Sequence, residues 1–274
     1  MLDLKKKVVL VVGGRGYLGR DFCYNLSKQG ATVISADLKE KSRAASKSIY
    51  KNKDSKIKQI NIDVTSKTSI TKVVNRILKQ YKKIDVLVFS VTSKPNDFYL
   101  PYTDCSLKGW QKVIQTELDG VFLVTQKVGK VMEAQKSGSI ILLSSIYGVV
   151  GNDQRIYDGS NLDDLYTNHN IKKNKKKIFS HSVYSAVKGG IISLTRYLAA
   201  YWGDRNIRVN CISPGGIYHP GENKGFVTKY SSKVPLGRKG NLNEVTPMVI
   251  FLSSNDSSYM TGQNIIIDGG WTAW

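Results

Sequence analysis

Short apolar runs alternate with longer amphipathic segments along the whole chain. The runs are rich in Val, Ile and Leu, as at residues 8–12, which is typical of parallel strands buried on both faces. The longer segments carry apolar residues at helical spacing. This alternation predicts an α/β fold, in which a doubly wound parallel sheet carries helices on both faces.

The pattern places each expected element. Strands are expected at residues 8–12, 32–36, 56–61, 86–90, 140–144, 208–212 and 264–268. Helices are expected at residues 21–28, 66–80, 107–135, 184–202 and 243–252. We find no internal repeat and no linker, so residues 1–274 are predicted to form a single domain. In such a sheet, ligands bind beyond the carboxyl ends of the strands.

A glycine-rich turn follows the first strand. Gly13, Gly16 and Gly19 fit the pattern G-x-x-G-x-x-G between a predicted strand and a predicted helix. Glycine lets the backbone approach a pyrophosphate closely, and the helix N-terminus offers free N–H groups to the phosphates. The turn therefore predicts a dinucleotide site, and a turn without a ligand is the alternative.

The second strand ends at Asp37, about twenty residues beyond this turn. A carboxylate there can accept hydrogen bonds from the adenosine ribose hydroxyls and repel a 2′-phosphate, so we expect NAD rather than NADP. Arg15 and Lys39 favour NADP, since either side chain could meet a phosphate. Asp37 could also be a simple helix cap.

Tyr184 and Lys188 are candidate catalytic residues. They are spaced i, i+4 at the start of an apolar helical segment, so their side chains share one helix face. A phenol titrates near pH ~10, and a nearby ammonium group favours the phenolate. The pair could therefore act as a general acid and base. Because surface helices carry such pairs by chance, its weight depends on the surrounding motifs.

With the turn and this pair, further segments make the chain similar to the short-chain dehydrogenase/reductase family over nearly its whole length. In order, these segments are residues 61–64, 138–145, 208–217 and 261–270. The resemblance implies a Rossmann-like sheet of about seven strands. It implies an NAD(P)-dependent oxidoreductase that transfers a hydride between nicotinamide and an alcohol or ketone. It also implies a homodimer or homotetramer formed through the helices at 107–135 and 184–202.

The resemblance also implies roles for individual residues. Tyr184 would exchange a proton with the substrate, Lys188 would hold the nicotinamide ribose, and Ser145 would hydrogen-bond the reacting oxygen. Ser145 is preferred to Ser144 because the family's catalytic serine is the second of such a pair. The implied cofactor-binding residues are Gly13, Arg15, Gly16, Tyr17, Leu18, Gly19, Asp37, Asp63, Val64, Ser90, Tyr184, Lys188, Pro214, Gly215 and Ile217.

Two departures separate the chain from the family pattern. After the fourth strand, Phe89-Ser-Val-Thr92 replaces Asn-Asn-Ala-Gly, and alignment of the following helix places Glu117 at the position of a catalytic Asn. Glu117 could polarise a water in a proton relay, and its charge should alter the pKa of Lys188. The alternative function is therefore a catalytically weakened protein of this fold that binds a nucleotide or acts as a scaffold.

Ser145 and Tyr184 are separated by many more residues than in the family, and the excess lies at about 152–181. Loops this long in a compact domain are usually functional or mobile. We expect this insertion to shape the substrate pocket, with Arg155, Tyr157 and His181 as candidate contacts; an idle surface excursion or a subunit contact is the alternative. The turn and the insertion resemble a branch of oxidoreductases from flagellin modification and nonulosonic acid pathways. That branch implies a sugar, sugar phosphate or nucleotide sugar as substrate.

The formal net charge of +20 at pH 7 is high. It could indicate a nucleic-acid partner. The lysines are spread along the chain and no nucleic-acid-binding motif accompanies them, so an anionic substrate or a lysine-rich composition explains the charge better, and we expect no nucleic acid. The densest basic run, residues 172–177, is expected to be a solvated loop.

We also predict a cytoplasmic protein. No apolar run is long enough to span a membrane, and the N-terminus lacks the pattern of a signal peptide. Cys23, Cys105 and Cys211 lack the spacing of a metal site and are expected to be buried thiols in a reducing cytosol. No metal is therefore expected.

Overall fold

A single parallel sheet forms the centre of the molecule. The computed structural model describes residues 3–38, 57–166 and 177–274. The seven strands lie in the order β3-β2-β1-β4-β5-β6-β7, and every neighbouring pair is parallel. The strands are β1 (Val8–Val12), β2 (Thr32–Asp37), β3 (Ile57–Asn61), β4 (Val86–Phe89), β5 (Gly138–Leu143), β6 (Ile207–Pro214) and β7 (Asn264–Ile267). The predicted sheet is thus confirmed, apart from the ends of some strands.

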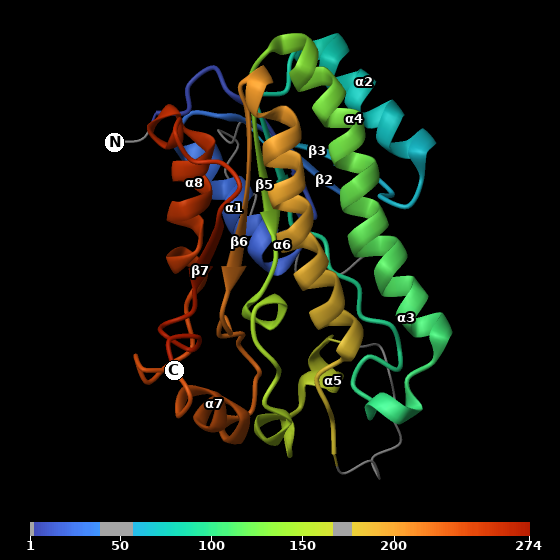
Figure 1. The fold of residues 1–274 in the computed structure, drawn as a ribbon, viewed down its shortest axis with the longest axis vertical. Helices are drawn as coiled ribbons and strands as arrows, with labels where there is room; N and C mark the ends of the chain where they lie inside the picture. Colours follow the sequence, from blue (N-terminus) through green and yellow to red (C-terminus); the bar gives the residue numbers. More distant parts are fainter. Residues whose placement is uncertain (1–2, 39–56, 167–176) are drawn as a thin grey trace.

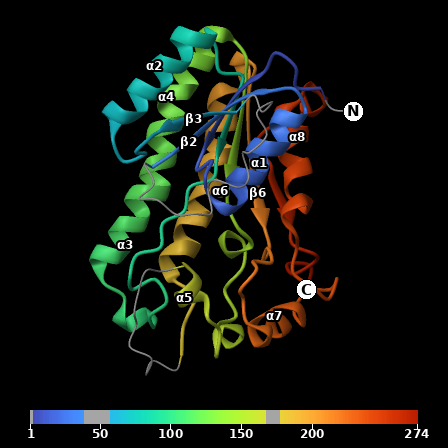
Figure 2. The same cartoon turned by 180° about the vertical axis from the view of Figure 1, so that it is seen from behind.

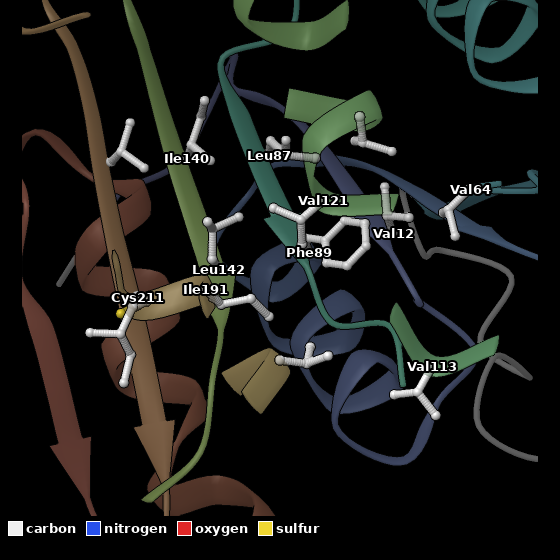
Figure 3. Close-up of a cluster of buried hydrophobic side chains, with 14 of the residues drawn as sticks. Val12, Val64, Leu87, Phe89, Val113, Val121, Ile140, Leu142, Ile191 and Cys211 are labelled. Atoms are coloured by element: carbon white, nitrogen blue, oxygen red, sulfur yellow. The ribbon is translucent and has the colours of Figure 1, made fainter. Parts of the chain in front are cut away.

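Alternate side chains of the central strands enter two separate hydrophobic layers. Leu10 and Val12 pack with the helices α2 (Lys67–Tyr81), α4 (Asp119–Gln135) and α6 (Ser182–Trp202). Val9 and Val11 pack on the opposite face with α1 (Tyr17–Lys28) and α8 (Thr246–Ser253). Figures 1 and 2 show the sheet between these two helical layers, and Figure 3 shows part of the first. The prediction of helices on both faces is therefore confirmed.

The helix expected at residues 107–135 is not uniform. It consists of α3 (Leu107–Val113), a π-helical turn (Ile114–Leu118) and α4. A π-turn inserts one extra residue into a helix and is frequent at functional sites. Here it contains Glu117, whose side chain is fully buried. A periodicity-based prediction cannot detect such a local widening, because the apolar pattern continues on both sides.

Several other boundaries differ from the predictions. Helix α1 begins at Tyr17, directly after Gly16, and α8 begins at Thr246 after a short 3-10 turn. Two short helices were not predicted: α5 (Leu162–Tyr166) and α7 (Lys224–Ser231). Cys105 is only half-buried, in contrast to the other two cysteines. Lys39 and most of the basic run at 172–177 lie outside the described residues.

Several of the predicted site residues lie at the carboxyl ends of the strands. The glycine-rich turn follows β1, Asp37 ends β2, Ser145 follows β5, and Pro214 ends β6. Figure 1 shows the strands pointing toward the end of the molecule where α5 and α7 lie. Among the described residues, no helix is both long and apolar enough to cross a membrane.

Candidate active site

Tyr184 and Lys188 lie on the first turns of α6, and both line a cavity with a volume of about 280 Å³. The Lys188 Nζ atom is 5.2 Å from the centre of the Tyr184 ring. Ser145 lines the same cavity from the segment after β5. Gly148 allows this segment to approach α6, because a Cβ atom there would lie 2.6 Å from the carbonyl carbon of Lys188. The structure thus brings Ser145, Tyr184 and Lys188 to one cavity.

The two adjacent serines have different surroundings. The Ser144 hydroxyl donates a hydrogen bond of 2.8 Å to the carbonyl of Lys188, which ties the end of β5 to α6. The Ser145 hydroxyl accepts a hydrogen bond from the Tyr147 backbone N–H, at 3.2 Å, and retains its own proton as a donor. Ser145 is therefore the better placed of the two to donate to a bound substrate oxygen.

Lys188 is held by a buried carboxylate. Its Nζ lies 3.0 Å from Glu117 Oε2 and donates a hydrogen bond of 3.2 Å to the carbonyl of Leu143. The other Glu117 oxygen accepts hydrogen bonds from the Thr92 hydroxyl and the Ser93 backbone N–H. Burial by itself would lower the pKa of Lys188, but the negative charge of Glu117, assisted by Tyr184, outweighs it and the pKa is raised. Lys188 is therefore a stable cation.

A groove with a volume of about 470 Å³ runs beside these residues. It is lined by predicted cofactor-binding residues together with Ser145 and Lys94: Gly16, Tyr17, Leu18, Ser90, Tyr184, Pro214, Gly215 and Ile217. Helix α1 begins at this groove with no side-chain cap and no acidic residue in its first turn, which leaves its N-terminal N–H groups available to an anion. The positive φ of Gly13 (84°) allows the preceding turn.

The other predicted cofactor-binding residues lie outside the lining of this groove. Gly13 belongs to the turn itself, Gly19 lies in the first turn of α1, and Asp63 and Val64 follow β3. Lys188 lines the adjacent cavity. Asp37 accepts hydrogen bonds from the backbone N–H groups of Arg15 (2.9 Å) and Leu38 (2.8 Å), which hold its carboxylate at the end of β2.

Arg15 makes different contacts through its side chain. Its guanidinium group donates to the carbonyl of Leu38 (2.8 Å) and to Asn61 Oδ1 (3.0 Å). Both acceptors are neutral, so among these contacts nothing neutralises the positive charge of Arg15.

The cavity has largely aromatic walls. These include Tyr99, Tyr147, Tyr157, Tyr166, Phe226 and Tyr230. The Tyr157 hydroxyl donates a hydrogen bond of 2.8 Å to the Tyr147 hydroxyl, and burial raises the pKa of Tyr157 to about 12. Both phenols are therefore neutral hydrogen-bonding groups at physiological pH.

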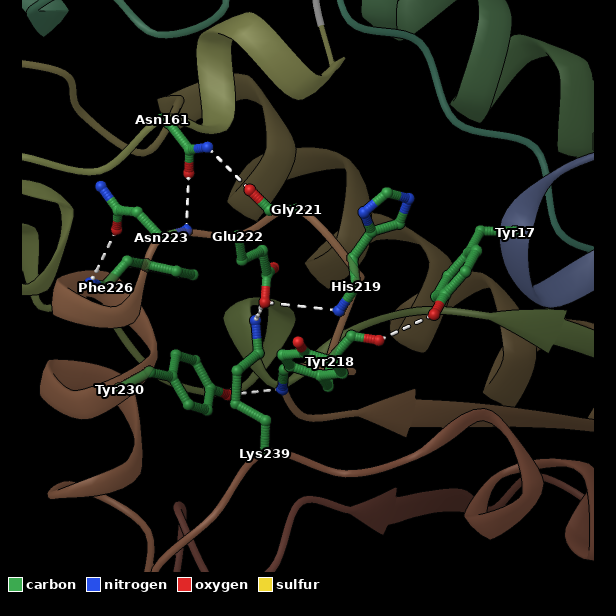
Figure 4. A network of polar contacts seen from close by, with 11 residues as sticks. Tyr17, Asn161, Tyr218, His219, Gly221, Glu222, Asn223, Phe226, Tyr230 and Lys239 are labelled. Carbon is green, nitrogen blue, oxygen red and sulfur yellow. Dashed lines mark hydrogen bonds and ion pairs between the residues drawn. The ribbon is translucent and has the colours of Figure 1, made fainter. Parts of the chain in front are cut away.

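Asn161, in the described part of 152–181, contacts the segment after β6, and residues of both segments line the cavity (Figure 4). Asn161 donates to the carbonyl of Gly221 (2.8 Å) and accepts from the backbone N–H of Asn223 (2.9 Å). Four residues of the described part of 152–181 line the cavity: Tyr157, Leu162, Tyr166 and Ser180. The Tyr17 hydroxyl donates to the carbonyl of Tyr218 (2.8 Å), so the start of α1 also contacts the segment after β6.

Two of the three candidate substrate contacts lie elsewhere. Arg155 does not line the cavity; its side chain is 83% exposed and pairs with Asp153 at 2.8 Å. His181 is buried and caps α6 by accepting the Val183 backbone N–H (3.1 Å), and it lines a neighbouring pocket instead. Of these three candidates, Tyr157 is the one that lines the cavity. Arg155 and Tyr157 both lie in a 3-10 helix (Gln154–Tyr157), in which residues two positions apart point in different directions, and the sequence did not predict this helix.

Sequence analysis missed three charged residues of the cavity. Lys94 follows β4. Glu222 and Lys239 form a buried ion pair of 2.6 Å in the cavity lining (Figure 4). The signal that could have identified Lys94 is its place directly after the segment that departs from the family pattern. Glu222 and Lys239 carried no such signal.

Comparisons with known proteins agree with this geometry. The family model of short chain dehydrogenases matches residues 7–160, and that of enoyl-(acyl carrier protein) reductases matches residues 170–272. The 3-oxoacyl-(acyl-carrier-protein) reductase of Thermotoga maritima is 32% identical over 98% of this chain and 99% of its own length. The NAD-dependent glycerol dehydrogenase of Listeria innocua is 31% identical over 98% of this chain and 95% of its own.

A solved structure shows the same fold. The short chain dehydrogenase of Leptospira borgpetersenii, crystallised with bound NAD⁺, superposes with a TM-score of 0.83 at 32% identity. The match covers 98% of this chain and 94% of that one.

Proposed function

The chain belongs to the short-chain dehydrogenase/reductase family, and on this premise we propose that it transfers a hydride between NAD(H) and an alcohol or ketone group of an anionic sugar derivative. The observation that carries the proposal is the convergence of Ser145, Tyr184 and Lys188 on one cavity. Ser145 and Tyr184 also line the adjoining groove, so a ligand in the cavity and one in the groove would meet at these two side chains.

The groove fits a nicotinamide dinucleotide. The uncapped N-terminus of α1 suits the pyrophosphate. A side chain at Gly13 would collide with the backbone of Ser90, and one at Gly19 would collide with the backbone of Gly13, so the close packing of the turn requires both glycines. When bound, the cofactor supplies or accepts the hydride. We propose NAD as the preferred form because the Asp37 carboxylate is fixed at the end of β2, where it would repel a 2′-phosphate.

The residues of the chain would handle the proton and the developing charge. Tyr184 is the proton donor in reduction and the acceptor in oxidation. The Lys188 ammonium, 5.2 Å from the Tyr184 ring, stabilises the anionic form that Tyr184 takes after giving up its proton. Ser145 donates a hydrogen bond to the reacting oxygen and stabilises its charge.

The cavity supports a substrate with a ring and polar substituents. Aromatic walls pack well against the C–H faces of a sugar, while the hydroxyls of Tyr147 and Tyr157 can exchange hydrogen bonds with its oxygens. We propose that the segment 152–181 sets this specificity, since it provides four wall residues. The resemblance to the nonulosonic acid branch remains a prediction.

The alternative of a catalytically weakened protein is less well supported, because all three reacting side chains line the cavity and Lys188 keeps a raised pKa. We further propose a cytoplasmic homo-oligomer. Phe122 of α4 and Tyr197 of α6 are at least half exposed, and such apolar groups favour a subunit contact through these two helices.

The proposed function is tested by following NADH absorbance with a panel of sugars, sugar phosphates and nucleotide sugars in both directions. We expect turnover with at least one member of the panel and its loss in Tyr184→Phe. Tight NADH binding without turnover on any member would favour the nucleotide-binding alternative instead.

A further inference from the structure

We propose that Lys94, together with the ring of Tyr166, forms a subsite that binds the carboxylate or phosphate of the substrate. This inference rests on the proposed function and assigns the residue that recognises the anionic group. Lys94 lines both the cavity that contains Tyr184 and the groove beside it. An anion held there would therefore lie at the junction of the two, next to the proposed site of hydride transfer.

In the part of the chain that the structure describes, three lysines line the cavity, and their partners differ. Lys188 has the Glu117 carboxylate at 3.0 Å, and Lys239 has the Glu222 carboxylate at 2.6 Å. The Lys94 ammonium lies 3.4 Å from the centre of the Tyr166 ring and, among the described residues, forms no ion pair with a carboxylate. Of these three described lysines, Lys94 is the cation whose charge is left for a ligand.

The surroundings of Lys94 lower its affinity for a proton. Burial lowers its pKa to about 7, although the more distant charges of Glu117 and Glu222 oppose the change. A cation–π contact with Tyr166 offsets only part of the lost hydration. A bound anion would supply the missing charge and raise the pKa again, so anion binding near neutral pH should be accompanied by proton uptake.

The position of Lys94 is fixed by its neighbours. The backbone N–H of Ser93 and the hydroxyl of Thr92 both donate to Glu117 Oε1, at 2.8 and 3.1 Å. The same carboxylate pairs with Lys188 through its other oxygen. One buried group therefore sets the distance between the segment that carries Lys94 and the catalytic helix, which suits a subsite that must align an anion with the reacting carbon.

A phosphate of the cofactor has the same chemistry as a substrate phosphate, because Lys94 also lines the groove. The two sources are separated by measuring NADH and a small anion independently. We propose calorimetric titration of inorganic phosphate into the protein saturated with NAD⁺, at fixed ionic strength, and a separate titration of NADH into the free protein.

Lys94→Met should weaken phosphate binding by about tenfold or more, the value of one charge-assisted hydrogen bond. Its NADH affinity should not change, and Lys94→Arg should restore much of the phosphate binding. The matched control is Lys79→Met, which removes the same charge from the exposed face of α2. The control should bind phosphate like the parent protein.

The pH dependence gives a second measurement. Only the protonated amine binds the anion, so in the parent protein the affinity for sulfate, whose charge does not change near neutral pH, should fall as the pH rises above about 7. The groups that face Lys94, namely Glu117, Glu222 and Tyr166, remain in Lys94→Met, which should lack this pH dependence. Equal phosphate binding by Lys94→Met and the parent protein would overturn the proposal, as would a loss confined to NADH. Because both readouts are equilibrium binding, they do not depend on turnover.

Discussion

Lys188 Nζ and Glu117 Oε2 are 3.0 Å apart, and both side chains are almost completely buried. One residue comes from the proposed catalytic helix and the other from the π-turn between α3 and α4. The expectation that Glu117 would alter the pKa of Lys188 agrees with the raised pKa of that lysine. A carboxylate at this position therefore secures the charge of Lys188, where an amide could only donate or accept a hydrogen bond.

Glu117→Gln should destabilise the protein. It leaves the Lys188 ammonium buried without a counter-charge, which costs about 3 kcal/mol or more. The free energy of unfolding in urea measures the loss. Asp204→Asn, in an exposed pair with Arg205, is the control and should leave stability unchanged. If Glu117→Gln is as stable as the parent, the pair is not a structural requirement.

Tyr184→Phe should lower kcat by about a hundredfold to ten-thousandfold, since it removes the group that we propose exchanges the proton. The phenyl ring can keep its edge-to-face contact with Phe98, at 6.3 Å between ring centres, so the fold should persist. Single-turnover kinetics with NADH separate this loss from cofactor binding, which should be unaffected. A kcat within a few-fold of the parent value would contradict the assigned role.

The two serines should differ in kcat. Ser145→Ala removes the proposed donor to the reacting oxygen and should reduce kcat by about a hundredfold. Ser144→Ala removes the hydrogen bond to the Lys188 carbonyl and should leave kcat within a few-fold of the parent value. Each substitution removes one buried hydrogen bond and should lower the free energy of unfolding by about 1 kcal/mol, so a similar loss of stability in both variants is the internal control. A large loss of kcat in Ser144→Ala alone would assign catalysis to Ser144.

Asp37→Ser should shift the preference of the protein toward NADP. The change removes the charge that repels a 2′-phosphate, while the guanidinium of Arg15 stays at the same strand end. The ratio of kcat/KM for NADP to that for NAD should rise by about tenfold. An unchanged ratio would show that Asp37 does not select the cofactor.

Arg155→Ala and Tyr157→Phe test how the insertion contacts the substrate. Arg155 points to solvent and pairs with Asp153, so its removal should leave KM unchanged. Tyr157→Phe removes a hydroxyl from the cavity wall and should raise KM by about threefold to tenfold. A larger effect of Arg155→Ala would mean that the loop rearranges when substrate binds.

The fold and the catalytic candidates were predictable because they depend on local patterns. Apolar runs of strand length and the glycine-rich turn fix the sheet, and the i, i+4 spacing places Tyr184 and Lys188 on one helix face. Asp37 lies at the predicted strand end for the same reason.

The remaining features depend on contacts between distant segments. His181 directly precedes α6 in sequence, and only the folded chain shows that its ring caps this helix. The pairing of Glu222 with Lys239 joins residues from separate loops, which no spacing predicts. The π-turn at Glu117 is likewise a response to tertiary packing, since the apolar periodicity alone predicts an unbroken helix.

The hydrogen bonds of Asn161 with Gly221 and Asn223 have a practical meaning for redesign. The Asn161 amide donates one hydrogen bond to this partner segment and accepts another from it. Grafting either loop alone from a homologous protein would therefore leave polar groups of the other loop without hydrogen-bond partners. A redesign of substrate selectivity should therefore replace both loops together. The residues that line the proposed dinucleotide groove can then be left unchanged.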